Sequence, residues 1–231
     1  MAMLNSQRVW LERELTVFAN SLPNGSIVLD AGSGRQQYKP LFTHCAYEAT
    51  DFEKVDKQYE PSTYVCDLTN IPVEDNRFDA VVFTQVMEHL PEPEQALKEL
   101  FRVTKPGGKM FYTGPLHYHE HEQPYDFYRY TQFGVRYLFE KAGWIVEDLR
   151  PLDGFLTTTA NHLRFMSSRL PWKPSDYAPG MWGWVAMLLF VPFRFLARGM
   201  ASVAAQAGAR GRYTKKGYAL NYLAHAIKPS S

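Results

Sequence analysis

A glycine-rich turn follows the first short apolar run of the chain. Residues 26–30 end in Asp30, and Gly32, Ser33 and Gly34 come directly after it. Glycines here would let the backbone turn sharply and let a ligand approach without meeting a Cβ atom. A carboxylate before the turn would repel a pyrophosphate, but it suits a ligand that carries an amine. The turn therefore predicts a binding site for an amine-bearing ligand.

Two further acids end the next two apolar stretches. Asp51 ends residues 47–51 and Asp67 ends residues 63–67. An acid at the position of Asp51 is placed to hydrogen-bond both hydroxyls of a ribose. Asp67 could accept a hydrogen bond from the exocyclic amine of an adenine. If the stretches are neighbouring parallel strands, these acids and Asp30 all face the crevice at the carboxyl edge of the sheet.

A nicotinamide cofactor is the alternative ligand for such a turn. The dinucleotide fingerprint Gly-x-Gly-x-x-Gly needs a third glycine, and Gln37 stands at its position. Asp30 also disfavours a pyrophosphate. Both observations favour S-adenosylmethionine, which carries an amine, over a dinucleotide and argue against an oxidoreductase.

Alternating strands and helices must position these residues. We expect helices at residues 4–20, 91–103 and 131–142, and strands at residues 26–30, 47–51, 63–67, 78–84, 109–113, 144–149 and 218–227. This alternation is typical of a parallel, doubly wound sheet. The fold class is therefore α/β: a Rossmann-like mixed sheet of seven strands, with helices on both faces and a helical insertion before the last strand.

The composition is that of an ordinary globular chain. Of its 231 residues, 45% are hydrophobic and 21% are charged, which argues against wholesale disorder. The two cysteines, Cys45 and Cys66, fit neither a disulfide framework nor a Cys-x-x-Cys metal pattern, so we expect reduced thiols. Arg8 and Glu12 stand near the N-terminus without a long apolar run, which argues against a signal peptide. We expect a cytoplasmic protein.

The order of the motifs resembles that of the class I S-adenosylmethionine-dependent methyltransferases, and most closely their type 11 group. The resemblance is carried by VLDAGSG (28–34), CDLTNIP (66–72), FDAVVFTQVMEHL (78–90) and LFRVTKPGGKMF (100–111). It implies a methyltransferase domain at 26–150 and 218–229, after an N-terminal helix at 1–25 and around a basic, apolar insertion at 151–217.

The resemblance also implies a role for each matching position. The cofactor's methionine part would lie against Asp30, Gly32, Ser33 and Gly34, and its ribose against Asp51. The adenine would meet the Phe52 ring on its face and Asp67 and Leu68 on its edge, and Gln85 would lie under the sulfonium.

A histidine-rich stretch follows the strand predicted at 109–113 and should roof the methyl-transfer site. For an alcohol acceptor a base removes a proton, and a histidine with a pKa near neutrality suits that role. We predict His121, and after it His119, as this base. Alternatively, these side chains only close the pocket. His89 would either brace the next helix or take part in catalysis.

Residues 121–131 (HEQPYDFYRYT) resemble a segment of methyltransferases associated with bacterial surface-polysaccharide synthesis. That likeness implies a small, glycan-like or lipid-linked acceptor methylated on oxygen. A protein that binds the cofactor without turnover is the alternative.

Zinc is an alternative use of the same stretch. His117, His119 and His121 stand at i, i+2 and i+4 and could bind Zn²⁺ from an extended segment, with Glu122 nearby. No further support for a second coordination shell accompanies them in the sequence. We therefore expect no metal.

Residues 160–217 differ from the rest of the chain in charge. They hold nine Lys and Arg and one acid, a net charge of +8, which leaves −7 for the remainder of a chain whose net charge is +1. Within them, residues 177–193 carry no charge and include Trp182, Trp184 and Phe190.

This composition is typical of a segment at an anionic membrane surface, so we predict a protein peripheral at the inner face of the membrane. The alternatives are a helix buried against the sheet or in a homodimer, and a spanning helix. The run is shorter than a membrane-spanning helix needs, and it is interrupted by Pro179, Gly180, Gly183 and Pro192. The aromatic run suits lipid or a protein partner better than nucleic acid, which we do not expect to bind.

Overall fold

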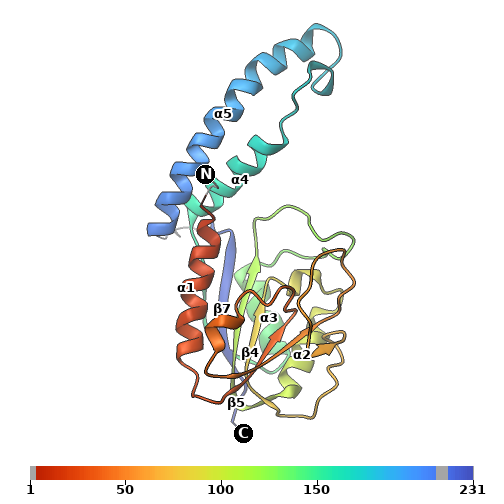
Figure 1. Cartoon of the computed structure of the whole chain (residues 1–231), viewed down its shortest axis with the longest axis vertical. Helices are drawn as coiled ribbons and strands as arrows, with labels where there is room; N and C mark the ends of the chain where they lie inside the picture. Colours follow the sequence, from red (N-terminus) through yellow and green to blue (C-terminus); the bar gives the residue numbers. More distant parts are fainter. Residues whose placement is uncertain (1–3, 212–217, 231) are drawn as a thin grey trace. The chain divides into compact units, whose positions relative to one another are not determined.

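The computed structural model describes residues 4–211 and 218–230, which divide into two compact units. The sheet unit comprises Leu11–Leu152 and the described residues from Asn221 onward. The hairpin unit comprises the described residues up to Trp10 and those of Asp153–Leu220. Figure 1 shows the elements of both units.

The sheet unit is built on a seven-stranded mixed sheet, as predicted. Its strands run in the order β3-β2-β1-β4-β5-β7-β6. Neighbours among β1–β5 pair in parallel, and β7 is antiparallel to both β5 and β6. The strands are β1 (Ile27–Ala31), β2 (Ala46–Asp51), β3 (Tyr64–Val65), β4 (Phe78–Thr84), β5 (Thr104–Pro115), β6 (Ile145–Pro151) and β7 (Asn221–Ile227).

Helices cover both faces of the sheet (Figure 1). They are α1 (Ser6–Asn20), α2 (Pro93–Val103) and α3 (Gln132–Lys141). Successive side chains of a strand point to opposite faces. Phe111 of β5 accordingly meets Phe18 of α1, with ring centroids 5.3 Å apart, whereas Tyr112 meets Phe139 of α3 at 5.2 Å. All four rings are buried, so the central strands carry a core on each face.

Several elements begin at another residue than predicted, and β7 begins at Asn221 rather than at residue 218. Helix α2 begins at Pro93 rather than at residue 91, because a 3₁₀ turn at Met87–His89 (η2) intervenes between β4 and α2. A proline in the first turn gives up no helical hydrogen bond, which suits this start. Strand β5 begins at Thr104 rather than at residue 109, since Thr104 pairs with Phe78 before a register shift.

The hairpin unit contains the predicted helical insertion as two helices. They are α4 (Phe155–Arg169) and α5 (Met181–Arg210), with a short 3₁₀ turn at Pro174–Asp176 (η3) between them. Pro192 and Gly183 were expected to interrupt the apolar run, but α5 continues through both for 30 residues. Arg212, Lys215 and Lys216 of the basic stretch lie outside the described residues.

Small side chains form the contact between α4 and α5. Ala197, Ala201, Ala205 and Gly208 of α5 are buried. A Cβ atom added at Gly208 would lie 2.7 Å from Oγ1 of Thr157 on α4, so the two backbones approach closely. The large apolar side chains of α5 point away from this contact and are exposed: Met181, Trp182, Trp184, Val185, Leu188, Leu189, Phe190, Phe195, Leu196, Met200 and Val203.

This arrangement shows how much of the apolar run is buried within its own unit. Within the hairpin unit α5 is not a buried helix, because α4 covers only its small residues. By length and composition α5 is the one helix among the described residues that could cross a membrane. The same test is passed by core helices of soluble proteins, so it does not choose between a membrane and a protein partner.

Candidate active site

A cavity of about 270 Å³ lies at the carboxyl edge of the sheet, where β1, β2 and β4 end. This is the crevice in which open α/β sheets bind ligands. Six of the predicted cofactor residues line it: Gly32, Asp51, Phe52, Asp67, Leu68 and Gln85. The structure thus brings together residues that stand more than fifty positions apart in the sequence.

The turn after β1 needs glycine at its first position. Gly32 has a φ of +76°, and a Cβ atom there would lie 2.5 Å from a methyl carbon of Val86, which also lines the cavity. The backbone N–H groups of Gly32 and Ser33 donate to the carbonyl of Thr50 at 2.8 and 3.0 Å. The turn is therefore held against the end of β2, and its backbone lies open to the cavity.

Asp51 links this turn to β2. Its Oδ2 accepts a hydrogen bond from the N–H of Gly34 at 2.9 Å, and its Oδ1 accepts one from the N–H of Glu53 at 3.1 Å. These bonds fix the carboxylate at the wall of the cavity before any ligand binds. A carboxylate fixed in this way is pre-organised to accept hydrogen bonds from a diol.

Asp30 sits behind the cavity lining. It is buried and accepts a hydrogen bond from the hydroxyl of Tyr47. Burial raises the pKa of Asp30 to about 6; the bond from Tyr47 opposes this shift, and the charge of Asp51 adds to it. A cationic ligand group nearby would favour the ionised form.

Asp30, Ser33 and Gly34 do not line the cavity itself, so their contacts with a cofactor stay predictions. Ser33 nevertheless supplies an independent sign of a ligand. Its Oγ is buried and has no hydrogen-bond partner in the described part of the chain. A buried hydroxyl is normally paired, so this atom fits a ligand that completes its hydrogen bonding.

The adenine end of the predicted site has an apolar floor. Leu68 is buried, and the Phe52 ring lies edge-on to Tyr125 with centroids 5.3 Å apart. Asp67 accepts bonds from both the N–H and the hydroxyl of Thr69, which fix its orientation.

The loop after β5 closes the other side of the cavity. The N–H groups of Phe127 and Tyr128 donate to the carbonyl of Glu88 at 2.8 and 3.2 Å. Glu122 forms an ion pair with Lys57 at 2.8 Å, and both residues line the cavity. The histidine-rich segment is therefore tied to two other parts of the sheet unit.

Asp126 organises the inside of this loop. Its carboxylate accepts hydrogen bonds from Arg129 at 2.6 and 2.8 Å and from the N–H of His121 at 2.8 Å. Burial alone would raise the pKa of Asp126, but these bonds outweigh it and lower the pKa to about 2.

The predicted catalytic histidines are not part of the cavity lining. Neither His121 nor His119 lines the cavity, whereas His89 does. The His121 ring meets the His89 ring edge-on at 4.6 Å, and burial together with His89 lowers the pKa of His121. The His119 ring stacks on Tyr118 at 4.4 Å. A catalytic role for His121 or His119 stays a prediction.

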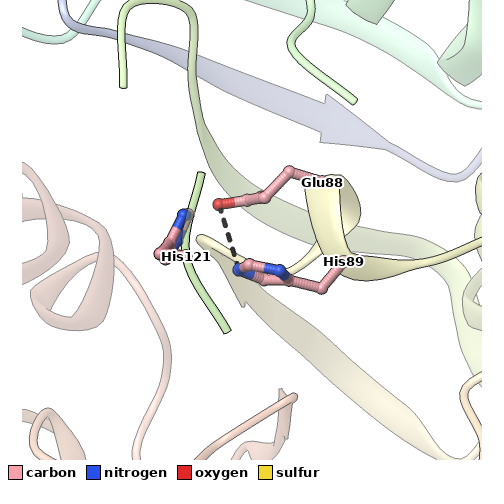
Figure 2. Close-up of side chains that lie close together, drawn as sticks. All are labelled: Glu88, His89 and His121. Carbon is pink, nitrogen blue, oxygen red and sulfur yellow. Dashed lines mark ion pairs between the residues drawn. The ribbon is translucent and has the colours of Figure 1, made fainter. Parts of the chain in front are cut away.

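Glu88 is the residue whose importance the sequence reasoning missed. Its side chain is fully buried, and neither carboxylate oxygen has a hydrogen-bond partner within residues 4–211 and 218–230. Burial raises the pKa of Glu88 to about 8. Figure 2 shows its carboxyl group beside His89 and His121. The available signal was an acid and a histidine directly after a strand predicted to end at the cavity.

The sheet and the cavity together define a fold class, a Rossmann-like mixed sheet of seven strands with a ligand crevice at its carboxyl edge. Residues 29–112 match the family model described as "Methyltransferase domain" (Methyltransf_11). Those residues include the glycine turn at 32–34, Asp51, which is predicted to bind the ribose, and the Glu88-His89 pair.

Curated relatives match over the same part of the chain. A tRNA (carboxymethyluridine(34)-5-O)-methyltransferase of Arabidopsis thaliana is 30% identical over 137 residues, 56% of this chain and 33% of the relative. A demethylmenaquinone methyltransferase of Renibacterium salmoninarum is 35% identical over 115 residues, 46% of this chain and 48% of the relative. The chain thus matches between a third and a half of the length of these relatives.

Solved structures share the fold at low identity. The [4+2]-cyclase SpnF has a TM-score of 0.56 and 19% identity, over 95% of this chain and 81% of its own. A phosphoethanolamine N-methyltransferase 2 of Haemonchus contortus, in complex with S-adenosyl-L-methionine, has a TM-score of 0.56 and 14% identity, over 95% of this chain and 52% of its own.

These findings confirm the predicted fold, enzyme class and cofactor at the level of the domain. Residues 29–112 form a class I, S-adenosylmethionine-dependent methyltransferase domain. The glycine turn, the fixed Asp51 carboxylate and the unpaired Ser33 hydroxyl fit that cofactor.

We expect Asp51→Asn to weaken binding of S-adenosylhomocysteine at least ten-fold. The substitution removes the charge from hydrogen bonds to the ribose, and bonds to a charged group contribute about 1.5–3 kcal/mol each. Calorimetric titration measures the affinity, and Asp56→Asn, an exposed acid outside the cavity, is the control. Equal affinities for the two variants would remove Asp51 from the site.

We expect the affinity for S-adenosylhomocysteine to fall about ten-fold between pH 7 and pH 5. Asp30 has a pKa of about 6 without ligand, so it is mostly ionised at pH 7 and mostly protonated at pH 5. The ligand ammonium group favours the ionised form, which links binding to proton release. Calorimetry across this range should show a flattened dependence for Asp30→Asn. If the affinity of Asp30→Asn depends on pH as steeply as that of the unchanged protein, a group other than Asp30 causes the dependence.

Proposed function

We propose that the protein transfers a methyl group from S-adenosylmethionine to an oxygen atom of a small, glycan-like or lipid-linked acceptor. The observation that carries this proposal is the cavity at the ends of β1, β2 and β4, which is lined by six residues predicted for the cofactor. A further wall of the same cavity, formed by residues of the loop after β5, is available to a second substrate.

When bound, the cofactor supplies an electrophilic methyl group, and the chain must align the acceptor and remove its proton. His89 is the imidazole at the cavity wall, and His121 lies directly behind it. In our proposal the His89–His121 pair receives the proton, with His121 as the first predicted base and His119 as the second. The rings of Tyr125 and Phe127 line the same cavity as His89.

The comparisons leave the acceptor open. One relative is named for a tRNA uridine and another for demethylmenaquinone, and each match covers under half of the relative. The oxygen acceptor therefore rests on the loop histidines, and the glycan-like class rests on the likeness of residues 121–131 to enzymes of surface-polysaccharide synthesis.

A second candidate is a protein that binds the cofactor without methyl transfer. The [4+2]-cyclase SpnF shares the fold, so the fold by itself does not require this activity. Such a protein would need the same cofactor residues. It would not need a histidine at the wall of an open cavity.

We expect labelled S-adenosylmethionine to transfer its methyl group to a component of a lipid or polysaccharide extract. His121→Ala should lower kcat by about 10²–10⁴-fold, the range for loss of a general base, while affinity for S-adenosylhomocysteine stays unchanged. Cofactor binding without transfer to any extract would favour the non-catalytic candidate. Transfer to tRNA alone would contradict the proposed acceptor class.

The hairpin unit supports a location at a membrane. Its helices bury alanine and glycine and expose large apolar side chains, the distribution of helices that pack inside lipid. Trp182 and Trp184 stand at the beginning of α5, in the part of the unit farthest along the chain from the sheet strands. Aromatic side chains of this kind sit at the membrane interface.

Basic side chains accompany this apolar surface. Arg164 and Arg169 lie on α4, and Arg198 and Arg210 on α5. Each cation near an anionic membrane contributes about 1 kcal/mol to binding. Arg194 differs, because it is buried with its guanidinium 3.7 Å from the Trp172 ring centroid. We propose that the protein is cytoplasmic and peripheral, with the tip of the hairpin unit in the lipid interface. The alternative cover for the same surface is a second copy of the chain.

We expect the intact protein to sediment with anionic vesicles at low salt and to do so less at 1 M salt, where the Debye length is about 3 Å. The triple variant Trp182→Ala, Trp184→Ala, Phe190→Ala should lose most of this binding. The matched control is Phe133→Ala, Tyr137→Ala, Ile145→Ala, which removes exposed apolar side chains from the sheet unit. The contrary result is a protein that fails to sediment and forms a dimer that the Trp182/Trp184/Phe190 variant dissociates and the control variant does not. That result would show that a second copy of the chain, and not a membrane, covers this surface.

A further inference from the structure

Three potential metal ligands converge beside the cavity. Glu88 and His89 belong to the 3₁₀ turn η2, and His121 comes from the loop after β5. One ligand atom of each lies within 4.8 Å of the other two, and Nε2 of His89 is 3.8 Å from Oε1 of Glu88 (Figure 2). The contact joins segments more than thirty residues apart in the chain.

Hydrogen bonds on the far side of each imidazole fix which nitrogen is free. Nδ1 of His89 lies 2.5 Å from the carbonyl oxygen of Tyr125, which can only accept, so Nδ1 carries the hydrogen. Nδ1 of His121 likewise faces the carbonyl of His119 at 3.2 Å and the carboxylate of Asp126 at 3.4 Å. In both neutral rings Nε2 therefore keeps its lone pair.

This is the outer arrangement that metal-binding histidines have. A carbonyl or carboxylate that accepts from the second ring nitrogen orients the ring and raises its basicity. Arg129 in turn holds Asp126 through two hydrogen bonds. The structure thus supplies the outer partners whose absence from the sequence pattern argued against a metal.

The buried carboxyl of Glu88 is an independent observation. It is fully buried, and neither oxygen has a hydrogen-bond partner in the described residues. A buried polar group without a partner is costly. The nearby guanidinium of Arg129 is engaged by Asp126 and does not reach it within hydrogen-bond distance. A cation between the Glu88 carboxylate and the two imidazoles would satisfy all three groups at once.

We infer that Glu88, His89 and His121 bind a divalent transition-metal ion such as Zn²⁺. Two imidazoles and one carboxylate are a ligand set of catalytic zinc sites, which keep a further position open. His89 is the one of the three that lines the cavity, so an ion held here would lie next to the cavity wall. This site shares only His121 with the set His117, His119, His121 and Glu122 considered from the sequence.

The role of the ion rests on the proposed function. With the ion bound, the two imidazoles are its ligands and cannot receive the acceptor proton. The ion would then take over activation of the acceptor: as a Lewis acid it would orient an acceptor oxygen and lower the pKa of its hydroxyl. Binding of the ion itself does not depend on that role, since all three ligands and their outer partners are present without substrate. The two proposals can therefore fail separately.

The test measures Zn²⁺ binding to the full chain. The protein is first treated with a chelator, and zinc chloride alone is then titrated into it in a calorimeter. We expect one ion per chain and a loss of at least ten-fold in affinity for Glu88→Gln, His89→Ala and His121→Ala. His119→Ala is the matched control in the same loop and should bind as the unchanged protein does. Titration with Co²⁺ provides a second readout, because visible absorption bands report ligation by the imidazoles.

Thermal unfolding, measured on every variant, shows that each one is folded, because His89 lines the cavity and its loss can itself change the affinity for S-adenosylhomocysteine. If His119→Ala weakens zinc binding as much as His121→Ala does, the loop histidines bind the ion and the proposed site is wrong. Absence of stoichiometric binding in the unchanged protein, with cofactor affinity intact, would overturn the metal site and leave the methyltransferase proposal standing.

Discussion

The parallel pairing of β1 with both β2 and β4 decides where the chemistry of this chain takes place. Asp30 of β1 lies opposite Ala49 on one side and Val82 on the other. The connections that leave β1 and β4 therefore run to opposite sides of the switch point and leave a crevice between them. Gly32 and Val86 meet across that crevice at a distance that a side chain on Gly32 would not permit. The backbone of the sheet thus positions the glycine turn, Asp51 and the Glu88-His89 pair together.

The loop after β5 depends on a different interaction, the hydrogen bonding of Asp126. This one carboxylate binds Arg129, the N–H of His121 and, less closely, the His121 ring. Two N–H groups just after it are held by the carbonyl of Glu88. The loop therefore carries its own internal support and is also tied to η2. Its histidines are placed by these bonds rather than by a strand or a helix.

That difference explains what could be predicted from the sequence. Strand periodicity and a strand-end acid indicate the sheet, the turn and Asp51, because these follow from local patterns and from the rule that parallel strands end at one edge. The contact of His121 with His89 has no such pattern, since it depends on how an irregular loop folds back. The sequence reasoning accordingly placed His121 over the cavity, whereas the structure places it behind His89. The continuity of α5 through Pro192 was missed because proline normally breaks a helix.

The two units also differ in how they use apolar side chains. In the sheet unit the large rings are inside: Phe83, Phe111, Tyr112 and Trp144 are all buried. In the hairpin unit α5 buries mainly alanine and glycine, together with Arg194, and 69% of the Trp182 surface stays exposed. Burying one large apolar side chain is worth about 1.5–3 kcal/mol, so a row of them left in water is a large unfavourable term. Small residues let α4 and α5 pack without using those side chains, which leaves the whole row for another surface. The proposed membrane location gives these side chains an apolar environment, and the cations along the same helices favour one that is also anionic.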